Sequence, residues 1–146
     1  MESMNRFIER DLFAKYLGIE IPEHGPGYAK AKLELTRNHL NSVGTVHGGV
    51  VFSLADAAFS AASNSRGAVS VAIQASISFF RAVSGGTLYA VAREAALSPK
   101  LATYSIEVRD GSDAPIALFQ GTVYRKTAKV EELLAESPAE PRPPRD

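Results

Sequence analysis

The chain of 146 residues contains no cysteine. Disulfide bonds, thiolate metal ligands and cysteine nucleophiles are therefore excluded. The chain also lacks a net charge, because 16 basic residues balance 16 acidic residues. A protein that binds nucleic acid through broad electrostatics needs a basic excess to neutralise phosphates, so we expect no nucleic-acid partner.

Long hydrophobic runs are absent as well. No stretch of the sequence approaches the roughly 20 apolar residues that span a bilayer, so we expect no membrane contact. The N-terminal segment MESMNRFIER is charged and lacks the apolar run of a signal peptide, which predicts a cytoplasmic protein. The three histidines do not cluster with acidic residues at ligand spacing, so we predict no metal site.

The remaining composition is typical of a globular domain, with 45% hydrophobic and 22% charged residues. The length predicts one domain with a normal core, which we place at residues 1–126. Residues 127–146 form a C-terminal extension, in which residues 129–136 favour a short helix. The last ten residues hold four of the eight prolines and are predicted to be disordered.

Hydrophobic periodicity predicts a short N-terminal helix over residues 5–17 that ends at Gly18. A series of strand patterns follows, and the turns between them are short enough to imply an antiparallel meander. The first strand is expected to break at Pro22, and the odd-numbered residues of the third strand are expected to share one face. The predicted strands cover residues 19–21, 28–35, 69–79, 88–97, 103–110 and 116–125.

Residues 41–64, with the sequence NSVGTVHGGVVFSLADAAFSAASN, contain a predicted helix at residues 48–63. Apolar or small side chains cover its whole circumference, which predicts a buried helix. We therefore expect an α+β fold in which a curved antiparallel sheet of five or six strands wraps this long central helix. Such a sheet leaves one edge and one side of the helix uncovered, and dimerisation would cover both.

One acid, Asp56, lies in the middle of this helix among apolar and small neighbours. Burying an ionised carboxylate without a partner is costly, so its presence needs a reason. The structural interpretation is that hydrogen bonds from Ser53, Ser60 or a neighbouring strand hold it. The catalytic interpretation rests on the start of the helix, residues 47–49 with the sequence His-Gly-Gly, where free amides favour developing negative charge. An oxyanion site and an isolated acid are two parts that acyl transfer requires.

The spacing of these two parts constrains how they can work together. Asp56 lies eight residues beyond Gly48, which is about 12 Å along a helix axis. Reacting groups must approach to about 3 Å, so both can serve one substrate only if Asp56 comes from a second copy. Two such helices, antiparallel across a two-fold axis, would place one N-terminus near the middle of the other. The spacing therefore predicts a dimer with shared sites.

Nearly the whole domain resembles a known family. The most specific feature is an Asn followed six residues later by His-Gly-Gly, with an Asp nine residues beyond that His. With the segments NSRG, ISFFRAVSGGTLYA, ATYSIEVRD and ALFQGTVYRK, this pattern resembles the hotdog-fold acyl-CoA thioesterases, specifically the phenylacetic-acid-degradation type. The resemblance implies a hotdog fold and hydrolysis of an acyl-CoA thioester. It also implies no cofactor beyond the coenzyme A of the substrate, and a homodimer that pairs into a homotetramer.

The resemblance also implies roles for individual residues. Asp56 corresponds to the family's catalytic carboxylate, which activates water or attacks the thioester directly. Gly48 corresponds to the glycine whose amide polarises the thioester carbonyl, and Asn41 to an asparagine that positions water or substrate. His47 supports the turn at the start of the helix. In the family the Asp works across the dimer from the Gly and the Asn, in agreement with the distance argument.

Four further residues are candidates for binding the substrate. Gly49 lets a ligand approach the backbone closely. Some relatives use a polar residue from the strand that follows the helix, and we favour Gln74 for that role. Arg81 and Lys100 are candidates for the coenzyme A phosphates, because Arg and Lys commonly bind phosphate. Surface charges at the ends of strands are the alternative interpretation for both.

Two other functions on the same fold stay open. A non-catalytic acyl-CoA sensor would not need Asp56, which argues against it. A hydroxyacyl-thioester dehydratase typically needs a His that works with an acid, and His47 within His-Gly-Gly does not fit that pattern. His24 and His39 are expected to be solvated or to cap loops. The sequence does not distinguish a base from a nucleophile at Asp56, nor an aryl from a medium-chain acyl group.

Overall fold

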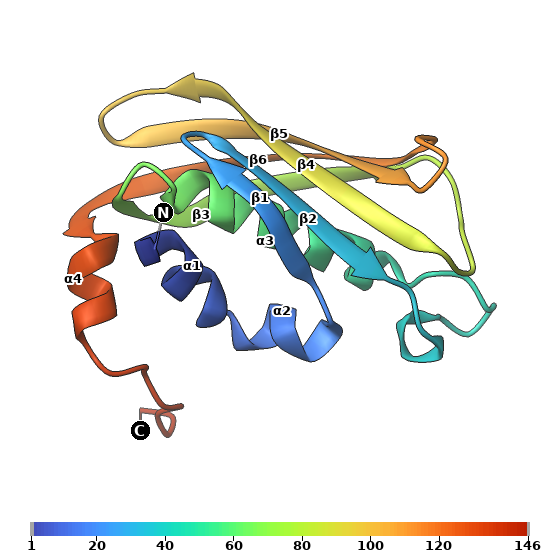
Figure 1. Cartoon of the computed structure of the whole chain (residues 1–146), viewed down its shortest axis with the longest axis horizontal. Helices are drawn as coiled ribbons and strands as arrows, with labels where there is room; N and C mark the ends of the chain where they lie inside the picture. Colours follow the sequence, from blue (N-terminus) through green and yellow to red (C-terminus); the bar gives the residue numbers. More distant parts are fainter. Residues whose placement is uncertain (1, 146) are drawn as a thin grey trace.

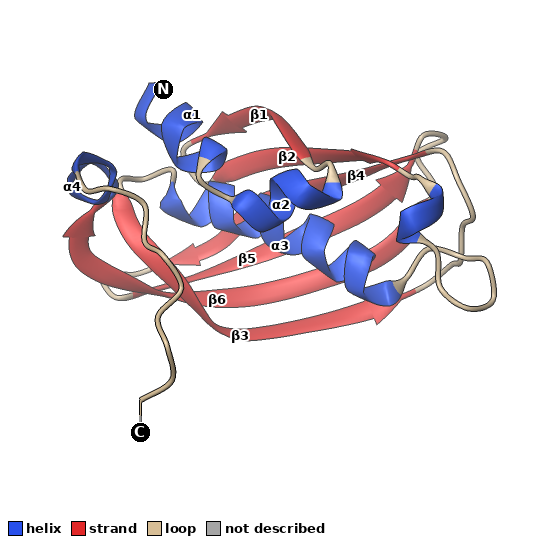
Figure 2. Ribbon diagram, turned by 90° about the horizontal axis from the view of Figure 1, so that it is seen from below, coloured by secondary structure: helices blue, strands red, loops and turns tan. Residues whose placement is uncertain are grey.

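The computed structural model describes residues 2–145, and Met1 and Asp146, the outer ends of the predicted domain and extension, lie outside that range. Helix α3 (Gly48–Asn64) lies along one face of a curved six-stranded sheet (Figure 1). Two short N-terminal helices cover part of α3 on the side away from the sheet (Figure 2). The predicted α+β architecture, with its short N-terminal helical segment, is confirmed. None of the helices within residues 2–145 has the length and apolar character needed to cross a membrane.

The sheet contains the strands β1 (Glu20–Gly25), β2 (Tyr28–Glu34), β3 (Ala68–Phe79), β4 (Thr87–Leu97), β5 (Leu101–Asp110) and β6 (Pro115–Lys129). All neighbours pair antiparallel, in the order β1-β2-β4-β5-β6-β3. Strands β4, β5 and β6 form the predicted meander. The sequence had predicted that β3 also belongs to this meander. That prediction is wrong, because β3 pairs with β6, while β2 pairs with the free side of β4. Residues 80–86 therefore connect strands that are not neighbours.

Strand β3 contains an irregularity that changes which side chains face α3. Ala72 pairs with Val123 but Gln74 pairs with Thr122, so Ile73 is one extra residue on β3. Such a bulge reverses the alternation of side chains between the two faces of the sheet. The expectation that the odd-numbered residues of this strand share one face is therefore wrong, because the residues before and after Ile73 alternate in opposite phase.

Strands β1 and β3 form the two edges of the sheet. The predicted break at Pro22 is wrong, because β1 continues to its end at Gly25, with irregular pairing between Glu20 and Glu23. An edge strand tolerates a proline, since one side of it has no partner that needs an N–H group. The two edges lie on opposite sides of α3 (Figure 2). The β3 edge exposes apolar side chains, among them Ile73, which is 59% exposed.

Small residues allow α3 to approach the sheet closely. Four alanines of β2 and β4 are completely buried beneath the helix: Ala29, Ala31, Ala90 and Ala92. Phe59 of α3 packs against the rings of Tyr104 and Phe119, with centroid distances of 5.8 and 5.6 Å. Gly121 makes room for this ring, because a Cβ atom there would lie 2.7 Å from it. Burying one such ring stabilises the fold by about 1.5–3 kcal/mol, so this cluster fixes α3 against β5 and β6.

The N-terminal segment forms two helices rather than the single helix predicted there. The first helix is α1 (Glu2–Glu9), and the second is α2 (Leu12–Leu17). The side chain of Asp11 accepts a hydrogen bond from the N–H group of Ala14 at 3.0 Å, and this N-cap starts a new helix. Gly18, with φ of 87°, ends α2 as predicted, because this left-handed conformation favours glycine.

The predicted C-terminal extension is partly structured. Strand β6 runs to Lys129, past the predicted domain boundary at Lys126. The predicted helix follows as α4 (Val130–Ala135), which lies beside α1 (Figure 1). Residues 137–145 contain neither helix nor strand.

Helices α1 and α4 are held together by a small core and by arginines. Val130 and Leu134 of α4 are buried against Met4 of α1. Arg10 donates three hydrogen bonds, of 2.6 to 3.2 Å, to main-chain carbonyl oxygens at the end of α4. Arg6 donates a further bond of 3.1 Å to one of these oxygens. Cations satisfy the unpaired carbonyls at a helix C-terminus, so these contacts join the two ends of the chain.

Candidate active site

One strip of α3 remains uncovered in the single chain. Its members are partly or fully exposed: Phe52, Ser53, Asp56 and Ser60. They recur at intervals of three or four residues, so they share one face of the helix. Figure 2 shows α2 on the β1 side of α3 and the β3 edge on the other side. The prediction that α3 is buried all round is therefore wrong for this face, and Asp56 lies on it.

The carboxyl group of Asp56 has no hydrogen-bond donor within residues 2–145. Ser53, one of the expected partners, donates instead to the main-chain oxygen of Gly49 at 2.7 Å. Asp56 is exposed in the single chain, although the surrounding protein partly desolvates its carboxyl group. This desolvation raises the pKa of Asp56 above its ordinary value, and the negative charge of Asp11 raises it further. The interpretation of Asp56 as a hydrogen-bonded structural carboxylate is therefore not supported.

The start of α3 carries an N–H group that is left without an acceptor. His47 caps the helix, because its Nδ1 accepts a hydrogen bond from the N–H group of Gly49 at 2.9 Å. A Cβ atom on Gly49 would lie 3.0 Å from that nitrogen, so a larger residue there would crowd the cap. The N–H group of Gly48 has no acceptor within the described chain. A Cβ atom on Gly48 would lie 3.3 Å from the ring of Phe79, so this ring packs closely against the backbone of Gly48.

Asn41 shapes the loop that precedes α3. Its Oδ1 accepts hydrogen bonds from the N–H groups of Val43 and Thr45 at 3.0 and 3.1 Å. Its Nδ2 donates to the hydroxyl of Thr45 at 3.0 Å. An amide nitrogen carries two N–H groups, and residues 2–145 use one of them, so the other can donate to a water or a substrate. Asn41 therefore both fixes the loop and offers a donor.

The single chain does not bring all the predicted catalytic residues together. His47 and Gly48 lie at the start of α3, and Asn41 lies in the loop before it. Asp56 lies eight residues beyond Gly48 on the same helix, about 12 Å along its axis. Reacting groups must approach to about 3 Å, so Gly48 and Asp56 of one chain are too far apart to act on one carbonyl group. The sequence had predicted this separation.

The predicted substrate-binding residues on the sheet are also dispersed. Gln74 pairs with Thr122, whose sequence neighbours are buried beneath α3, so Gln74 lies on the outer face of the sheet. Arg81 follows the end of β3 and forms an ion pair with Asp110 at 3.2 Å. Lys100 lies in the β4–β5 turn near the start of β3, so about 30 Å of strand separates it from Arg81. One chain alone cannot hold one phosphate group with both cations.

Comparisons with known proteins identify the family. Residues 43–117, which include Gly48 and Asp56, match the thioesterase superfamily. The chain belongs to this superfamily. The acyl-coenzyme A thioesterase PaaI of Escherichia coli is 36% identical over 125 residues, which cover 85% of this chain and 89% of that protein.

Solved structures agree with this assignment of the chain to the thioesterase superfamily. The structure of the E. coli PaaI protein matches with a TM-score of 0.84 and 35% identity, over 88% of this chain and 94% of that one. A mutant of the phenylacetic acid degradation protein PaaI from Thermus thermophilus matches with a TM-score of 0.76 and 40% identity, over 80% of this chain and all of that one. The hotdog fold, the resemblance to the phenylacetic-acid-degradation type and the enzyme class, thioester hydrolase, are confirmed.

One acidic neighbour of Asp56 in this thioesterase was not predicted. Asp11 caps α2, and its charge contributes to the raised pKa of Asp56. The sequence contains a local signal for the cap, since an Asp before an apolar run is a common N-cap. It contains no local signal for the packing of α2 against α3, which brings the two acids near each other.

The two histidines outside the helix start have structural partners. His39 is buried rather than solvated: its Nδ1 accepts a hydrogen bond from the N–H group of Thr36 at 2.9 Å, and its Nε2 donates to the oxygen of Leu17 at 2.8 Å. This is the capping role given as the alternative. His24 bonds to the Asn5 side chain at 2.8 Å. Within residues 2–145, no three His, Asp or Glu side chains converge on a point that could hold a metal ion.

Proposed function

We propose that this protein hydrolyses an acyl-CoA thioester with an aryl or medium-chain acyl group, and that Asp56 carries the reaction. The observation behind this proposal is the carboxyl group of Asp56 itself. It lies on the exposed strip of an otherwise buried helix, and no group of the described chain donates a hydrogen bond to it. This carboxylate is exposed and therefore available to a water or a substrate, and its pKa is raised, as is common for groups at functional sites. The name of the E. coli relative, acyl-coenzyme A thioesterase, supports the choice of substrate.

The chemistry needs one carboxylate and one hydrogen-bond donor. As a base, Asp56 takes a proton from a water whose oxygen attacks the thioester carbon. Negative charge then develops on the carbonyl oxygen, and the N–H group of Gly48 stabilises it. The carbon–sulfur bond breaks, and the coenzyme A thiolate leaves and takes up the proton. As a nucleophile, Asp56 would instead form a mixed anhydride that water hydrolyses, and both routes use the same carboxylate.

We assign Gly48 and Asp56 of one active site to different copies of the chain. The β3 edge is unpaired and exposes apolar side chains such as Ile73, features that favour pairing with a second chain. Two β3 strands paired antiparallel across a two-fold axis would lay the two α3 helices side by side in opposite directions. Asp56 of one copy would then lie near Gly48 and Asn41 of the other. The pairing of two such dimers into a homotetramer is a further prediction of the resemblance.

The coenzyme A phosphates require cations at the mouth of the site. Arg81 follows the end of β3, the strand whose edge would form the dimer. Lys100 lies near the other end of the same strand. Because the strands of a two-fold dimer run in opposite directions, Arg81 of one copy and Lys100 of the other would approach the same end of the shared sheet. Alanine variants that raise KM with kcat unchanged would identify which of them binds phosphate.

The proposal is tested with wild type and Asp56→Asn on a panel of acyl-CoA thioesters. We expect wild type to hydrolyse at least one of them and Asp56→Asn to lose about 10²–10⁴-fold in kcat. Asp113→Asn is the matched control, because Asp113 lies in an exposed loop between β5 and β6. Full activity of Asp56→Asn would show that the carboxylate has been misassigned.

The same panel separates the other functions on this fold. Binding of acyl-CoA by wild type without hydrolysis would identify a sensor. Conversion of a hydroxyacyl-CoA to its unsaturated product would identify a dehydratase. The oligomeric state tests the shared site independently, because a monomer at the assay concentration could not place Asp56 beside Gly48.

A further inference from the structure

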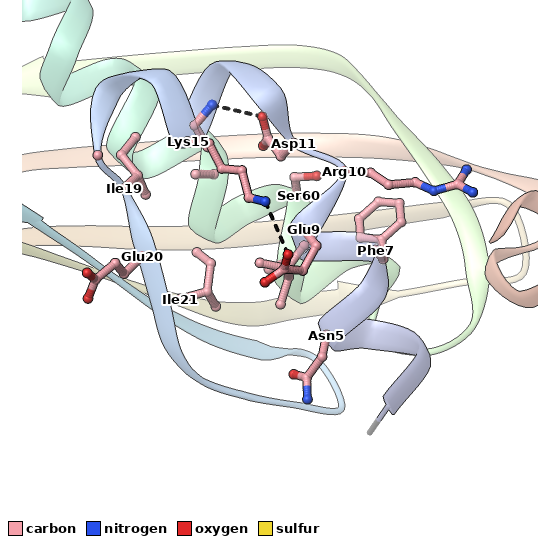
Figure 3. Close-up of a pocket in the computed structure, with 15 residues that line it drawn as sticks. Asn5, Phe7, Glu9, Arg10, Asp11, Lys15, Ile19, Glu20, Ile21 and Ser60 are labelled. Carbon is pink, nitrogen blue, oxygen red and sulfur yellow. Dashed lines mark hydrogen bonds and ion pairs between the residues drawn. The ribbon is translucent and has the colours of Figure 1, made fainter. Parts of the chain in front are cut away.

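A groove of about 810 Å³ lies between the N-terminal helices, β1 and α3 (Figure 3). Small residues of α3 form its floor: Ala57, Ser60 and Ala61. Apolar side chains line its walls: Phe7, Ile8, Ile19 and Ile21. The function proposed above has not used this space.

The two cations at the rim of the groove already have partners. Lys15 forms an ion pair with Glu9 at 3.1 Å across the opening (Figure 3). Arg10 donates its hydrogen bonds to the carbonyl oxygens at the end of α4. Neither cation is therefore offered to an anionic ligand, and the acidic residues of the rim would disfavour one, whereas the walls between them carry the apolar side chains named above. A ligand that fits this groove is an apolar chain.

The groove begins beside Asp56. Ala57 follows Asp56 directly, and Ser60 lies one turn further on the same face of α3, where Cβ atoms four residues apart are about 5–6 Å from each other. Asp11, the acidic neighbour of Asp56, lies on the rim of the groove. A chain attached to a thioester at Asp56 could therefore pass over Ser60 and continue along the wall formed by β1.

We propose that this groove holds the distal part of a medium-chain, unbranched acyl group. The proposal rests on the proposed function, because it assigns the acyl part of the same substrate. The size of the groove favours a chain over a single ring, since a cavity of about 150 Å³ already holds benzene. Its volume lies in the range of about 300–1,000 Å³ that is typical of sites for whole small ligands.

Ser60 determines whether the chain can enter. Its side chain is small and only half-buried, so a leucine there can be accommodated in the fold while it fills the end of the groove nearest Asp56. The neighbouring Ala61 is 2% exposed, and a larger residue at that position would overpack the core. Ser60→Leu is therefore the variant that blocks the groove. Ile21→Ala, on β1, is a second variant that removes contacts from the far wall.

The test compares kcat/KM for acetyl-, hexanoyl-, decanoyl- and phenylacetyl-CoA in wild type, Ser60→Leu and Ile21→Ala. In wild type we expect about a threefold to fourfold rise per methylene over the length that enters the groove, the equivalent of about 0.8 kcal/mol per buried CH₂. The decanoyl-to-acetyl ratio should fall at least about tenfold in Ser60→Leu and about threefold in Ile21→Ala. Ser105→Leu, the same change on β5, should leave the ratio unchanged. A ratio that is unchanged in both groove variants overturns the proposal.

Binding measurements separate a failure of this proposal from a failure of the proposed function. Decanoyl-CoA is titrated into Asp56→Asn and into the double variant with Ser60→Leu, so that no hydrolysis is needed. A dissociation constant about tenfold weaker in the double variant supports the groove even if no thioester is turned over, and equal constants overturn it. Free decanoate tests whether the groove instead serves a separate fatty acid. Competitive inhibition of decanoyl-CoA hydrolysis supports the acyl subsite, whereas a change in kcat with KM unchanged overturns it.

Discussion

Two carboxylates, one on helix α3 and one on the neighbouring strand β4, have opposite surroundings. Glu94 of β4 accepts hydrogen bonds from Arg66 at 2.7 and 3.0 Å and from the hydroxyl of Tyr104 at 3.0 Å. Asp56, in the middle of the helix, accepts none within residues 2–145. The bonds from Arg66 and then Tyr104 hold the pKa of Glu94 below its ordinary value, whereas desolvation and the charge of Asp11 raise that of Asp56.

This difference separates a structural acid from a reactive one. Arg66 follows the C-terminal end of α3, so its pairing with Glu94 attaches that end of the helix to the sheet. The hydrogen bonds that Glu94 accepts from Arg66 and Tyr104 therefore stabilise the fold. Asp56 stabilises nothing in this way, and a carboxylate kept in that state is the one that can act on a substrate.

Replacing Asp56 with Asn should have the largest effect on activity. We expect a loss of about 10²–10⁴-fold in kcat, because Asn neither takes a proton nor attacks a carbonyl. Steady-state kinetics with the best acyl-CoA of the panel measures it. The comparison fails if Glu94→Gln lowers kcat by the same factor, because the two acids would then share a role.

Replacing Glu94 with Gln should have the largest effect on stability. We expect the free energy of unfolding to fall by about 1.5–3 kcal/mol, the range for hydrogen bonds to charged groups. Because the folded-state pKa of Glu94 is lowered, this stability is present above its unfolded pKa and is lost as the pH falls through the folded pKa. Urea unfolding at a series of pH values measures both the loss and its disappearance in acid.

The matched control for Glu94→Gln is Glu107→Gln. Glu107 pairs with Arg109 at 3.1 Å, but both side chains are exposed, and such pairs contribute about 0–1 kcal/mol. Equal losses of stability in the two variants would contradict the structural role of Glu94.

Asp56→Asn should also change stability, by a smaller amount and in the opposite direction. The raised folded-state pKa means that the charged carboxylate disfavours the folded state at pH values above that pKa. At neutral pH we therefore expect a gain of about 0.5 kcal/mol, the scale of changes at partly exposed positions. The gain should vanish at pH values below the unfolded pKa of Asp, where the wild-type carboxyl is protonated in both states. Thermal unfolding at neutral and acidic pH measures this, and a destabilised variant at neutral pH contradicts it.

The smallest effect is expected from Asp11→Asn. Asn keeps the N-cap of α2 but removes the charge near Asp56, so the pKa of Asp56 should fall. Because the reaction needs the ionised carboxylate, the acid limb of the pH–rate profile should move to lower pH. The pH dependence of kcat/KM measures the shift, with Asp113→Asn again as the control. A movement to higher pH would contradict the assigned direction.

The sequence was sufficient where local patterns determine the structure. The periodicity of residues 48–63 predicted α3 to within one residue of its end, and the short turns predicted the β4–β5–β6 meander. The Gly48–Asp56 spacing follows from the rise of a helix and needed no tertiary information. The wider assignment of roles depended on the family resemblance rather than on physical patterns.

Long-range pairing and single-residue insertions lay beyond these patterns. Nothing local indicates that β3 pairs with β6 rather than with β4, because the choice depends on which strand edge is already occupied by β2. The extra residue at Ile73 fits the alternation on either side and is visible only through its pairing partners. The nearness of Asp11 to Asp56 follows from the docking of one helix on another. Each of these features affects a face or an edge that borders the candidate site.

The contacts between α1 and α4 also affect the order in which the chain can fold. During synthesis α1 emerges before α4, yet part of the packing surface of α1, Val130 and Leu134, belongs to α4. The arginines of the N-terminal segment likewise find their carbonyl acceptors only when α4 has formed. The wall of the groove that α1 provides is therefore completed only once α4 has emerged, after every residue of the sheet and of α3 has been synthesised. A chain stopped before residue 130 would contain every residue of the proposed catalytic set and still have a loosened acyl groove.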